Sequence, residues 1–348
     1  MQLELTRPDD WHVHLRDGDG LAAVTRHTAR QFARAIVMPN LKPPVTTVAA
    51  AAAYRERILA AVPAGAAFEP LMTLYLTDDT SPDEIVRAKA SGFVHAVKFY
   101  PAGATTNSEN GVTDWNEVRP TLAKLAEVNL PLLLHGEVTD ADVDVFDREH
   151  VFLERHLTPL LRDFPDLRVV LEHVTTAEAV AFVRAAGANV AATITAHHLL
   201  WNRSEIFRGG LRPHAYCLPV LKRERHRQAL LAAATGDDPS FFLGTDSAPH
   251  PRSRKESDCG CAGIYTALTA LELYAEAFEQ AGAIDRLEAF ASHRGADFYR
   301  LPRNRDKVVL VREPQRVPPE LPFGEGSLVP MRGGETVGWR LLGATGDT

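Results

Sequence analysis

Short apolar runs of strand-like composition alternate with longer stretches of helical composition along the chain, and this alternation constrains the fold more than any other feature. We expect eight strands, which end near His14, Asn40, Leu76, Tyr100, His135, His173, Thr195 and Asp246. Helices are expected after them, at residues 21–30, 47–61, 83–90, 115–128, 151–163, 176–186, 223–234 and 268–280. Eight β-then-α units predict an α/β fold, a closed parallel (β/α)8 barrel of the TIM type. A doubly wound open sheet is the alternative, but no glycine-rich dinucleotide-binding motif supports it.

The domain organisation follows from this pattern. We expect the barrel to occupy residues 1–313, and the Pro/Gly-rich residues 314–348 to form a C-terminal extension packed on the barrel rather than a second domain. Two long segments, residues 101–114 and 250–263, lack strand or helix patterns. Such loops in a compact domain are often lids or binding loops, and a solvated connection is the alternative.

Charge and cysteine content limit the partners and the compartment. The chain has 38 Lys and Arg against 45 Asp and Glu, a net charge of −7, and no basic stripe, so we expect no nucleic-acid partner. There is neither a signal-peptide pattern nor a long apolar run, so we expect no membrane partner. Sparse cysteines, at positions 217, 259 and 261, suit a reducing cytoplasm. The pair Cys259 and Cys261 could bind a metal, but a loop role is favoured because zinc needs about three or four protein ligands.

Two histidines close the first expected strand. His12 and His14 are two residues apart, so both side chains point to the same side of the strand, which in a barrel is the interior. Two imidazoles fill a core poorly but begin a metal site well. A pair of hydrogen-bonded histidines is the alternative.

Further polar residues end other apolar runs, where a barrel places its catalytic groups. They are Lys98, His135, His173 and Asp246. Each buried polar group needs a partner, so a shared metal site explains the set better than separate core contacts do. Four histidines and an aspartate exceed what one tetrahedral zinc with an open position needs, which suggests two metals. A cationic Lys98 would be repelled there, whereas a lysine that has captured CO₂ becomes an anionic carbamate with two oxygens. The alternative is a Lys98 that forms a salt bridge away from the metals.

Several sequence motifs around these residues resemble those of a known enzyme family. DWHVHLRDG at residues 10–18 and GTDSAPHPRSRK at residues 244–255 resemble the two signature segments of dihydroorotases, within the amidohydrolase superfamily. Matching segments also lie at residues 38–40, 98–114, 133–137, 171–176, 214–222 and 334–341. The resemblance covers essentially the whole chain and is closest to the shorter, stand-alone bacterial type.

The resemblance implies an activity and a role for each site residue. The activity is the reversible cyclisation of N-carbamoyl-L-aspartate to L-dihydroorotate in pyrimidine (UMP) synthesis. The resemblance also implies a homodimer, and the expected partner of the enzyme is this small-molecule substrate. One zinc would be held by His12, His14 and Asp246, and a second by His135 and His173, with carboxylated Lys98 and a hydroxide bridging them. The substrate carboxylate would be held by Arg16, Asn40 and His250. Backbone atoms of Leu218 and Ala262 would contact the ring, and Thr105 and Thr106 would form the tip of a lid. Asp246 would also act as general acid and base.

Two other functions stay open at this stage. Another cyclic amide hydrolase, such as a hydantoinase or an allantoinase, would share the metals but lack the anchors Arg16, Asn40 and His250. A non-catalytic scaffold homologue should have lost metal ligands, whereas all six are present here.

Overall fold

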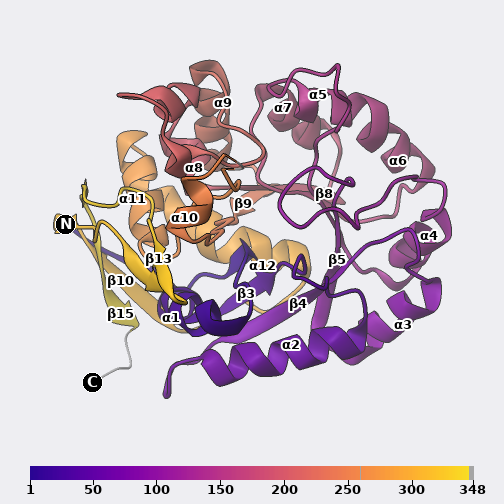
Figure 1. Ribbon diagram of the computed structural model, residues 1–348, viewed down its shortest axis with the longest axis horizontal. Helices are drawn as coiled ribbons and strands as arrows, with labels where there is room; N and C mark the ends of the chain where they lie inside the picture. Colours follow the sequence, from indigo (N-terminus) through magenta and orange to yellow (C-terminus); the bar gives the residue numbers. More distant parts are fainter. Residues whose placement is uncertain (259, 345–348) are drawn as a thin grey trace.

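Eight parallel strands form the centre of the computed structural model, which describes residues 1–258 and 260–344 (Figure 1). The strands follow one another in chain order around the sheet. They are β2 (Asp10–Val13), β3 (Arg34–Val37), β4 (Glu69–Tyr75), β5 (Val94–Phe99), β6 (Leu132–Leu134), β7 (Val169–Leu171), β8 (Val190–Ile194) and β9 (Phe241–Leu243).

The last strand returns to the first. Val13 bridges Ser247 in parallel, the His14 N–H donates to the Ser247 carbonyl at 3.1 Å, and the Asp246 N–H donates to the His12 carbonyl at 2.9 Å. These bonds close the sheet just beyond β9, so the predicted barrel is confirmed and the open doubly wound sheet is wrong. A closed sheet leaves no unpaired edge, and its inward-facing side chains form a core of their own.

One side chain from each strand fills the lower barrel. These residues are Trp11, Ile36, Leu71, Ala96, Leu133, Val170, Ala191 and Phe242. Helix α12 (Arg294–Tyr299) closes this end, because Ala296 and Tyr299 join the same cluster and the Tyr299 ring stacks on Trp11 with centroids 4.5 Å apart. Side chains two residues further along a strand lie one layer higher on the same side. That rule places Lys98, His135 and Glu172 above the apolar layer.

The strand β2 departs from regular alternation. Its pairing with β3 shifts register between Asp10 and Val13. Such a bulge lets Trp11 enter the lower layer while His12, its neighbour, contacts residues of the barrel mouth.

Most of the helices surround the barrel, as the outer ring in Figure 1 shows, whereas the short helix at Arg252–Lys255 lies inside that ring in the segment after β9. Besides α12, the helices are α1 (Leu21–Gln31), α2 (Val48–Ala61), α3 (Pro82–Ser91), α4 (Arg119–Val128), α5 (Arg148–Phe152), α6 (Thr158–Asp163), α7 (Ala177–Ala185), α8 (Ala196–Leu200), α9 (Glu224–Ala234), α10 (Arg252–Lys255) and α11 (Ala270–Gln280). Thr47 and Thr176 cap α2 and α7 by accepting hydrogen bonds from backbone N–H groups at 3.2 and 3.1 Å.

Two helix predictions need correction. The helix expected from residue 115 begins only at Arg119, where Pro120 in the first turn suits a helix start. The helix expected over residues 151–163 starts at Arg148 and contains a π-helical turn at Leu153–Leu157 between α5 and α6.

The tail of the chain pairs with its beginning. Strand β10 (Lys307–Val311) lies between β1 (Gln2–Thr6) and β15 (Arg340–Ala344) in an antiparallel sheet. Two small antiparallel sheets pair β11 (Gln315–Arg316) with β14 (Thr336–Val337), and β12 (Leu321–Phe323) with β13 (Gly326–Leu328). The buried Trp339 donates its indole N–H to Glu279 of α11 at 3.1 Å. We therefore propose that residues 314–344 extend the barrel domain. Residues 345–348 and Cys259 lie outside the described residues.

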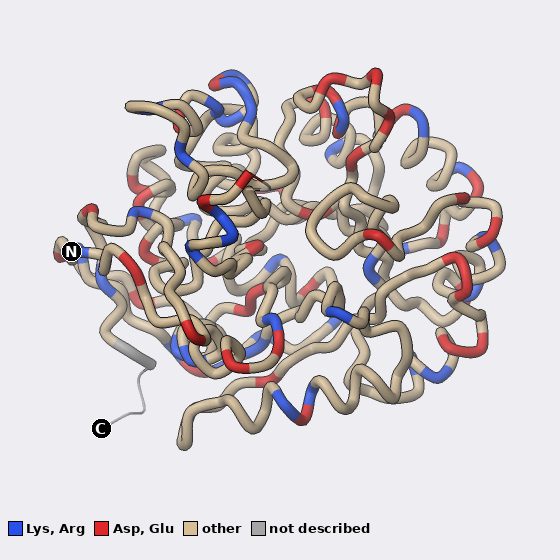
Figure 2. Tube along the Cα trace, viewed as in Figure 1, with Lys and Arg blue, Asp and Glu red and all other residues tan. Residues whose placement is uncertain are grey.

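Charges of both signs are interspersed along the outer helices in Figure 2. Within the described part of the chain, no helix has the length and apolar character that a membrane crossing requires.

Candidate active site

A small pocket opens at the carboxyl ends of the barrel strands. It is lined by His12, His14, Arg16, Asn40, Tyr100, Thr105, Thr106, His135, His173, Leu218, Asp246, Ala248, Ala262 and Gly263. The structure thus brings together all the site residues expected from the sequence, except that Lys98 lies beneath the lining and His250 lies behind Arg16. Their separation along the chain, from position 12 to position 262, shows that the barrel closure assembles the site.

Two histidine side chains converge on one oxygen of Asp246. Its Oδ1 lies 3.2 Å from His12 Nε2 and 3.1 Å from His14 Nε2, and these two nitrogens are 3.4 Å apart. Ligand atoms of His12, His173 and Asp246 also lie within 4.8 Å of one another. Imidazole and carboxylate groups at this spacing suit a zinc ion.

A second group of donors adjoins the first. The ring of His173 lies 5.0 Å from that of His12 and 4.9 Å from that of His135, centroid to centroid. His135 Nε2 contacts Glu137 Oε2 at 2.8 Å, so Nδ1 is the ring nitrogen left for another partner, and the buried His173 Nδ1 has no hydrogen-bond partner. The candidate donors therefore extend from Asp246 and His12 through His173 to His135.

Lys98 occupies the floor of this site. Its side chain is fully buried, its Nζ pairs with Glu172 Oε2, and the same nitrogen lies 4.7 Å from the centroid of the Tyr100 ring. The salt bridge considered for Lys98 exists, but it lies inside the histidine cluster, because Glu172 Oε1 is 2.9 Å from His12 Nδ1.

Burial and neighbouring charges set the protonation of the cluster. Burial, helped by Arg16, lowers the pKa of His14 to about 4, and burial lowers the pKa of His173 well below its usual value. Burial also opposes a charge on His12, but the carboxylates of Glu172 and Asp246 prevail and raise its pKa to about 9. Two buried carboxylates around one imidazole create a negative potential that favours a cation.

An unusual backbone conformation orients three of the side chains at the barrel mouth. Arg16, His173 and Asp246 have φ values of 58°, 42° and 45°, in the left-handed region that residues with a Cβ rarely adopt. The His173 N–H is held by Thr193 Oγ1 at 2.7 Å. Each residue lies two or three positions after the end of a strand, and the left-handed turn there redirects its side chain over the mouth.

A cationic anchor lies at one side of the pocket. The Arg16 Nε donates to the Pro249 carbonyl at 3.2 Å, and its terminal nitrogen lies 3.1 Å from His250 Nε2. Burial and the nearby guanidinium lower the pKa of His250 to about 2, so its imidazole is neutral. A guanidinium with a neutral imidazole beside it can bind a carboxylate through charged and neutral hydrogen bonds.

The loop at residues 101–114 covers the pocket. The Asn40 side chain donates to the Thr106 carbonyl at 3.0 Å, and the Thr106 hydroxyl donates to the Ala262 carbonyl at 3.4 Å. Thr105 is held within the loop by its N–H, which donates to the Ser108 hydroxyl at 2.8 Å. The loop therefore connects the first half of the site with the segment after β9.

Comparisons with known proteins agree with this geometry. Residues 10–305 match the model of the Amidohydrolase family. The dihydroorotase of Microcystis aeruginosa is 67% identical over 340 residues, which cover 98% of this chain and 99% of that protein. The dihydroorotase of Cupriavidus taiwanensis is also 67% identical, over 97% of this chain and 98% of that protein.

The chain belongs to the dihydroorotase family of amidohydrolases.

Solved structures of this family superimpose closely. The crystal structure of Saccharomyces cerevisiae dihydroorotase in complex with 5-fluoroorotic acid has a TM-score of 0.90 at 34% identity, covering 98% of both chains. The Campylobacter jejuni dihydroorotase has a TM-score of 0.89 at 34% identity, covering 98% of this chain and 97% of that one. An L-hydantoinase from Arthrobacter aurescens shares the fold, with a TM-score of 0.80, but at 16% identity it shows the fold alone. The family membership makes this chain a hydrolase, which removes the scaffold alternative.

Three residues of this dihydroorotase site were missed by sequence reasoning. Glu172 and Glu137 contact candidate metal ligands, and Tyr100 lines the pocket. The signal for Glu137 was available, because it lies two residues after His135, the spacing at which strand side chains share a side.

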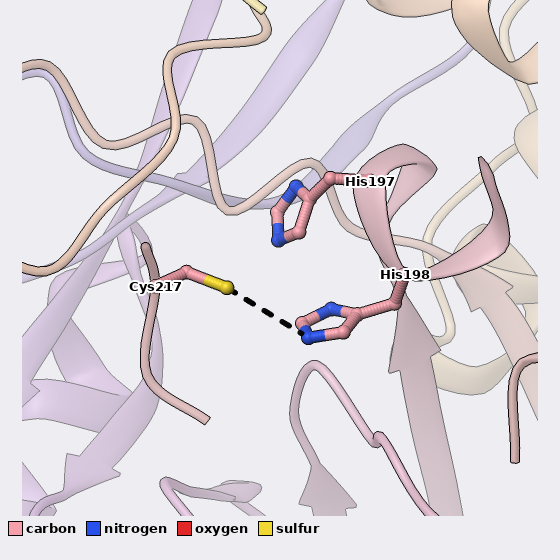
Figure 3. Close-up of side chains that lie close together, drawn as sticks. All are labelled: His197, His198 and Cys217. Atoms are coloured by element: carbon pink, nitrogen blue, oxygen red, sulfur yellow. Dashed lines mark hydrogen bonds between the residues drawn. The ribbon is translucent and has the colours of Figure 1, made fainter. Parts of the chain in front are cut away.

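A second buried histidine cluster lies outside the pocket lining, where His197 and His198 of α8 face Cys217 (Figure 3). The Pro219 carbonyl can only accept, so His198 Nε2 carries the ring hydrogen and donates it to that carbonyl at 3.2 Å. His198 Nδ1 then accepts the hydroxyl hydrogen of Thr195 Oγ1 at 2.8 Å, and the same oxygen accepts the His198 backbone N–H. Burial raises the pKa of Cys217 to about 12, and its thiol donates to the same carbonyl. Two of the three candidate metal ligands, His198 and Cys217, are thus used in hydrogen bonds, so we assign no metal to this cluster.

Proposed function

We propose that the chain catalyses the reversible cyclisation of N-carbamoyl-L-aspartate to L-dihydroorotate and water, at a binuclear zinc centre. The observation that supports this most directly is the convergence of His12 and His14 on Asp246, beside the anchor formed by Arg16 and His250. A metal site next to a carboxylate-binding group is what an anionic cyclic amide requires.

The donor set fits the proposed metals. The histidines His12 and His14 would hold one zinc together with Asp246, and His135 and His173 would hold the other. Lys98 would serve as a further ligand only as a carbamate, because an ammonium would add positive charge to a buried site that would hold two dications. When bound, the zinc ions would polarise the carbonyl that is attacked and lower the pKa of a bound water to roughly 7.

The chain's own residues bind and orient the substrate. Arg16, with Asn40 and His250, would hold the α-carboxylate, since a guanidinium forms two parallel hydrogen bonds to such a group. Backbone atoms of Leu218 and Ala262, both in the pocket lining, would contact the ring. Thr105 and Thr106 would exclude water while the loop covers the pocket.

Asp246 would move the proton. In ring closure the carbamoyl nitrogen attacks the side-chain carboxyl carbon, a C–N bond forms, and the nitrogen loses a proton to Asp246. That carboxylate would then pass the proton to the departing oxygen, which leaves as water after a second proton arrives from solvent. In hydrolysis Asp246 would deliver a proton to the amide nitrogen.

Two further proposals rest on the family resemblance and the cysteine content. The first is that the chain forms a homodimer. The second is that it is located in the cytoplasm, a reducing compartment. Within the described residues, Cys217 and Cys261 are free thiols.

A comparative assay tests the proposed function. Purified enzyme with measured zinc content is given dihydroorotate, N-carbamoyl-L-aspartate, hydantoin and allantoin. We expect turnover of the first two, with about two zinc ions per chain, and at least a hundredfold lower rates with hydantoin and allantoin. Faster turnover of hydantoin or allantoin than of dihydroorotate would contradict the proposal.

A further inference from the structure

One buried carboxylate at the floor of the site has no role in the reaction outlined above. The side chain of Glu172 is fully buried and follows β7 directly. Its two oxygens contact different groups, since Oε1 lies 2.9 Å from His12 Nδ1 and Oε2 pairs with Lys98 Nζ. Because His12 and Lys98 come from β2 and β5, this single side chain joins two parts of the barrel wall that β3 and β4 separate.

The contact with His12 has a consequence for its tautomer. His12 Nε2 faces Asp246 and His14, the side on which a metal would lie. For Nε2 to offer a lone pair there, the hydrogen of the neutral ring must sit on Nδ1, and a carboxylate acceptor beside Nδ1 favours that form. The ring N–H is not aligned on Oε1 as a full hydrogen bond requires, but no other acceptor reaches this nitrogen among the described residues.

The contact with Lys98 has a parallel consequence. Carboxylation joins the deprotonated amine to CO₂, forms an N–C bond and releases one proton to water. The product keeps one N–H on the former Nζ, so that N–H can still donate to Glu172 Oε2. Donation from that N–H to Glu172 would fix the orientation of the carbamate group and so the direction in which its two oxygens face.

We propose that Glu172 is a positioning residue that orients two ligands of the metal centre at once, His12 and carboxylated Lys98. This inference rests on the proposed function, because it presumes a metal centre that includes both residues. A purely structural role predicts that Glu172 matters only as a countercharge for Lys98, whereas a positioning role predicts that the place of each carboxylate oxygen matters.

Two substitutions separate these roles. Glu172→Gln keeps the shape of the side chain, but only one of its two terminal atoms can accept a hydrogen bond. Glu172→Asp keeps the charge, but its carboxylate lies about 1.5 Å further from His12 and Lys98. Glu272→Gln is the control, because Glu272 is an equally buried carboxylate in α11 whose partners are Arg30, Gln315 and the Leu341 N–H. Zinc affinity is measured by competition with a chelator, and the carbamate by ¹³C NMR after exposure to ¹³C-bicarbonate.

We expect both Glu172 variants to bind zinc at least tenfold more weakly than wild type, within the 10- to 100-fold range for a lost partner of a metal ligand. The carbamate signal should fall in both, and the control should match wild type. If Glu172→Asp keeps zinc affinity within about twofold and the full carbamate signal, the positioning role is wrong. The positioning role is also wrong if Glu172→Gln keeps zinc affinity within about twofold and the full carbamate signal. If Glu172→Gln fails to fold, the result for Glu172→Asp alone tests the positioning role. A wild-type protein that itself lacks two zinc ions or the carbamate would instead overturn the proposed function.

Discussion

The side-chain amide of Asn40 connects the candidate metal ligand His14 to the lid. Its Oδ1 lies 2.9 Å from His14 Nδ1, and its Nδ2 donates to the Thr106 carbonyl at 3.0 Å. Since Nδ2 must donate to Thr106, Oδ1 must accept from His14, and the hydrogen of the neutral His14 ring is therefore on Nδ1. His14 Nε2 is then free to bind a metal.

This relationship predicts different effects for two substitutions of Asn40. Asn40→Asp still accepts from His14 but cannot donate to Thr106 and repels the substrate carboxylate, so we expect normal zinc content and a KM raised at least tenfold. Asn40→Ala leaves the His14 N–H unpaired and should also weaken zinc binding. Metal analysis and steady-state kinetics on the same samples check both. Asn107→Asp, which removes only a lid contact to the Asn40 carbonyl, is the control. An unchanged KM in Asn40→Asp would rule out contact between Asn40 and the substrate.

The anchor Arg16 should determine substrate binding. Arg16→Ala removes a charged, two-bond grip worth about 1.5–3 kcal/mol, so we expect KM to rise at least tenfold for both substrates. Arg16→Lys keeps the charge but cannot form two parallel hydrogen bonds, so its KM should lie between the values of wild type and Arg16→Ala. Arg57→Ala removes a nearby exposed guanidinium that pairs with Asp17 and should change KM by less than twofold. If KM for dihydroorotate stays within about twofold in Arg16→Ala, the assignment of Arg16 is wrong.

The lid should matter for turnover and not for metal binding. Deletion of Thr105 and Thr106 removes the bond to the Ala262 carbonyl and the cover over the pocket. We expect kcat to fall at least tenfold while zinc content stays the same, because no candidate ligand belongs to this loop. Loss of zinc from the deletion variant would show instead that the loop holds the site together structurally.

The sequence was sufficient to predict the eight strands and the polar residues at their ends, because both depend on local periodicity. It was not sufficient for Glu172. Strand alternation puts Glu172 and its neighbour His173 on opposite sides, and only the left-handed backbone at His173 turns both toward the mouth. The bulge that lets Trp11 and His12 both face inward, and the closure of the lower barrel by α12, also depend on contacts between distant segments.

Lys98 should be carboxylated in the active enzyme. Lys98→Ala should lose activity and at least one zinc, and a short carboxylic acid should restore part of both by occupying the place of the carbamate. Lys98→Arg should stay inactive, because arginine remains protonated and cannot capture CO₂. Lys222→Ala, which removes another buried lysine that donates to the Val220 carbonyl, should retain zinc. Density for an unmodified lysine between two occupied zinc sites in a crystal would contradict this prediction.

The direction of the reaction should depend on pH, because N-carbamoyl-L-aspartate carries two carboxylates and dihydroorotate carries one. Ring closure therefore consumes a proton, and above about pH 6 all three carboxyl groups are ionised. The equilibrium ratio of dihydroorotate to N-carbamoyl-L-aspartate should then fall about tenfold for each pH unit, so synthesis is favoured at low pH and hydrolysis at high pH. Chromatography of mixtures brought to equilibrium from both sides between pH 6 and 9 measures the ratio. Because an enzyme cannot shift an equilibrium, mutant and wild-type enzyme must reach the same value at each pH. A ratio that stays flat over this range would mean that the chain catalyses a different reaction.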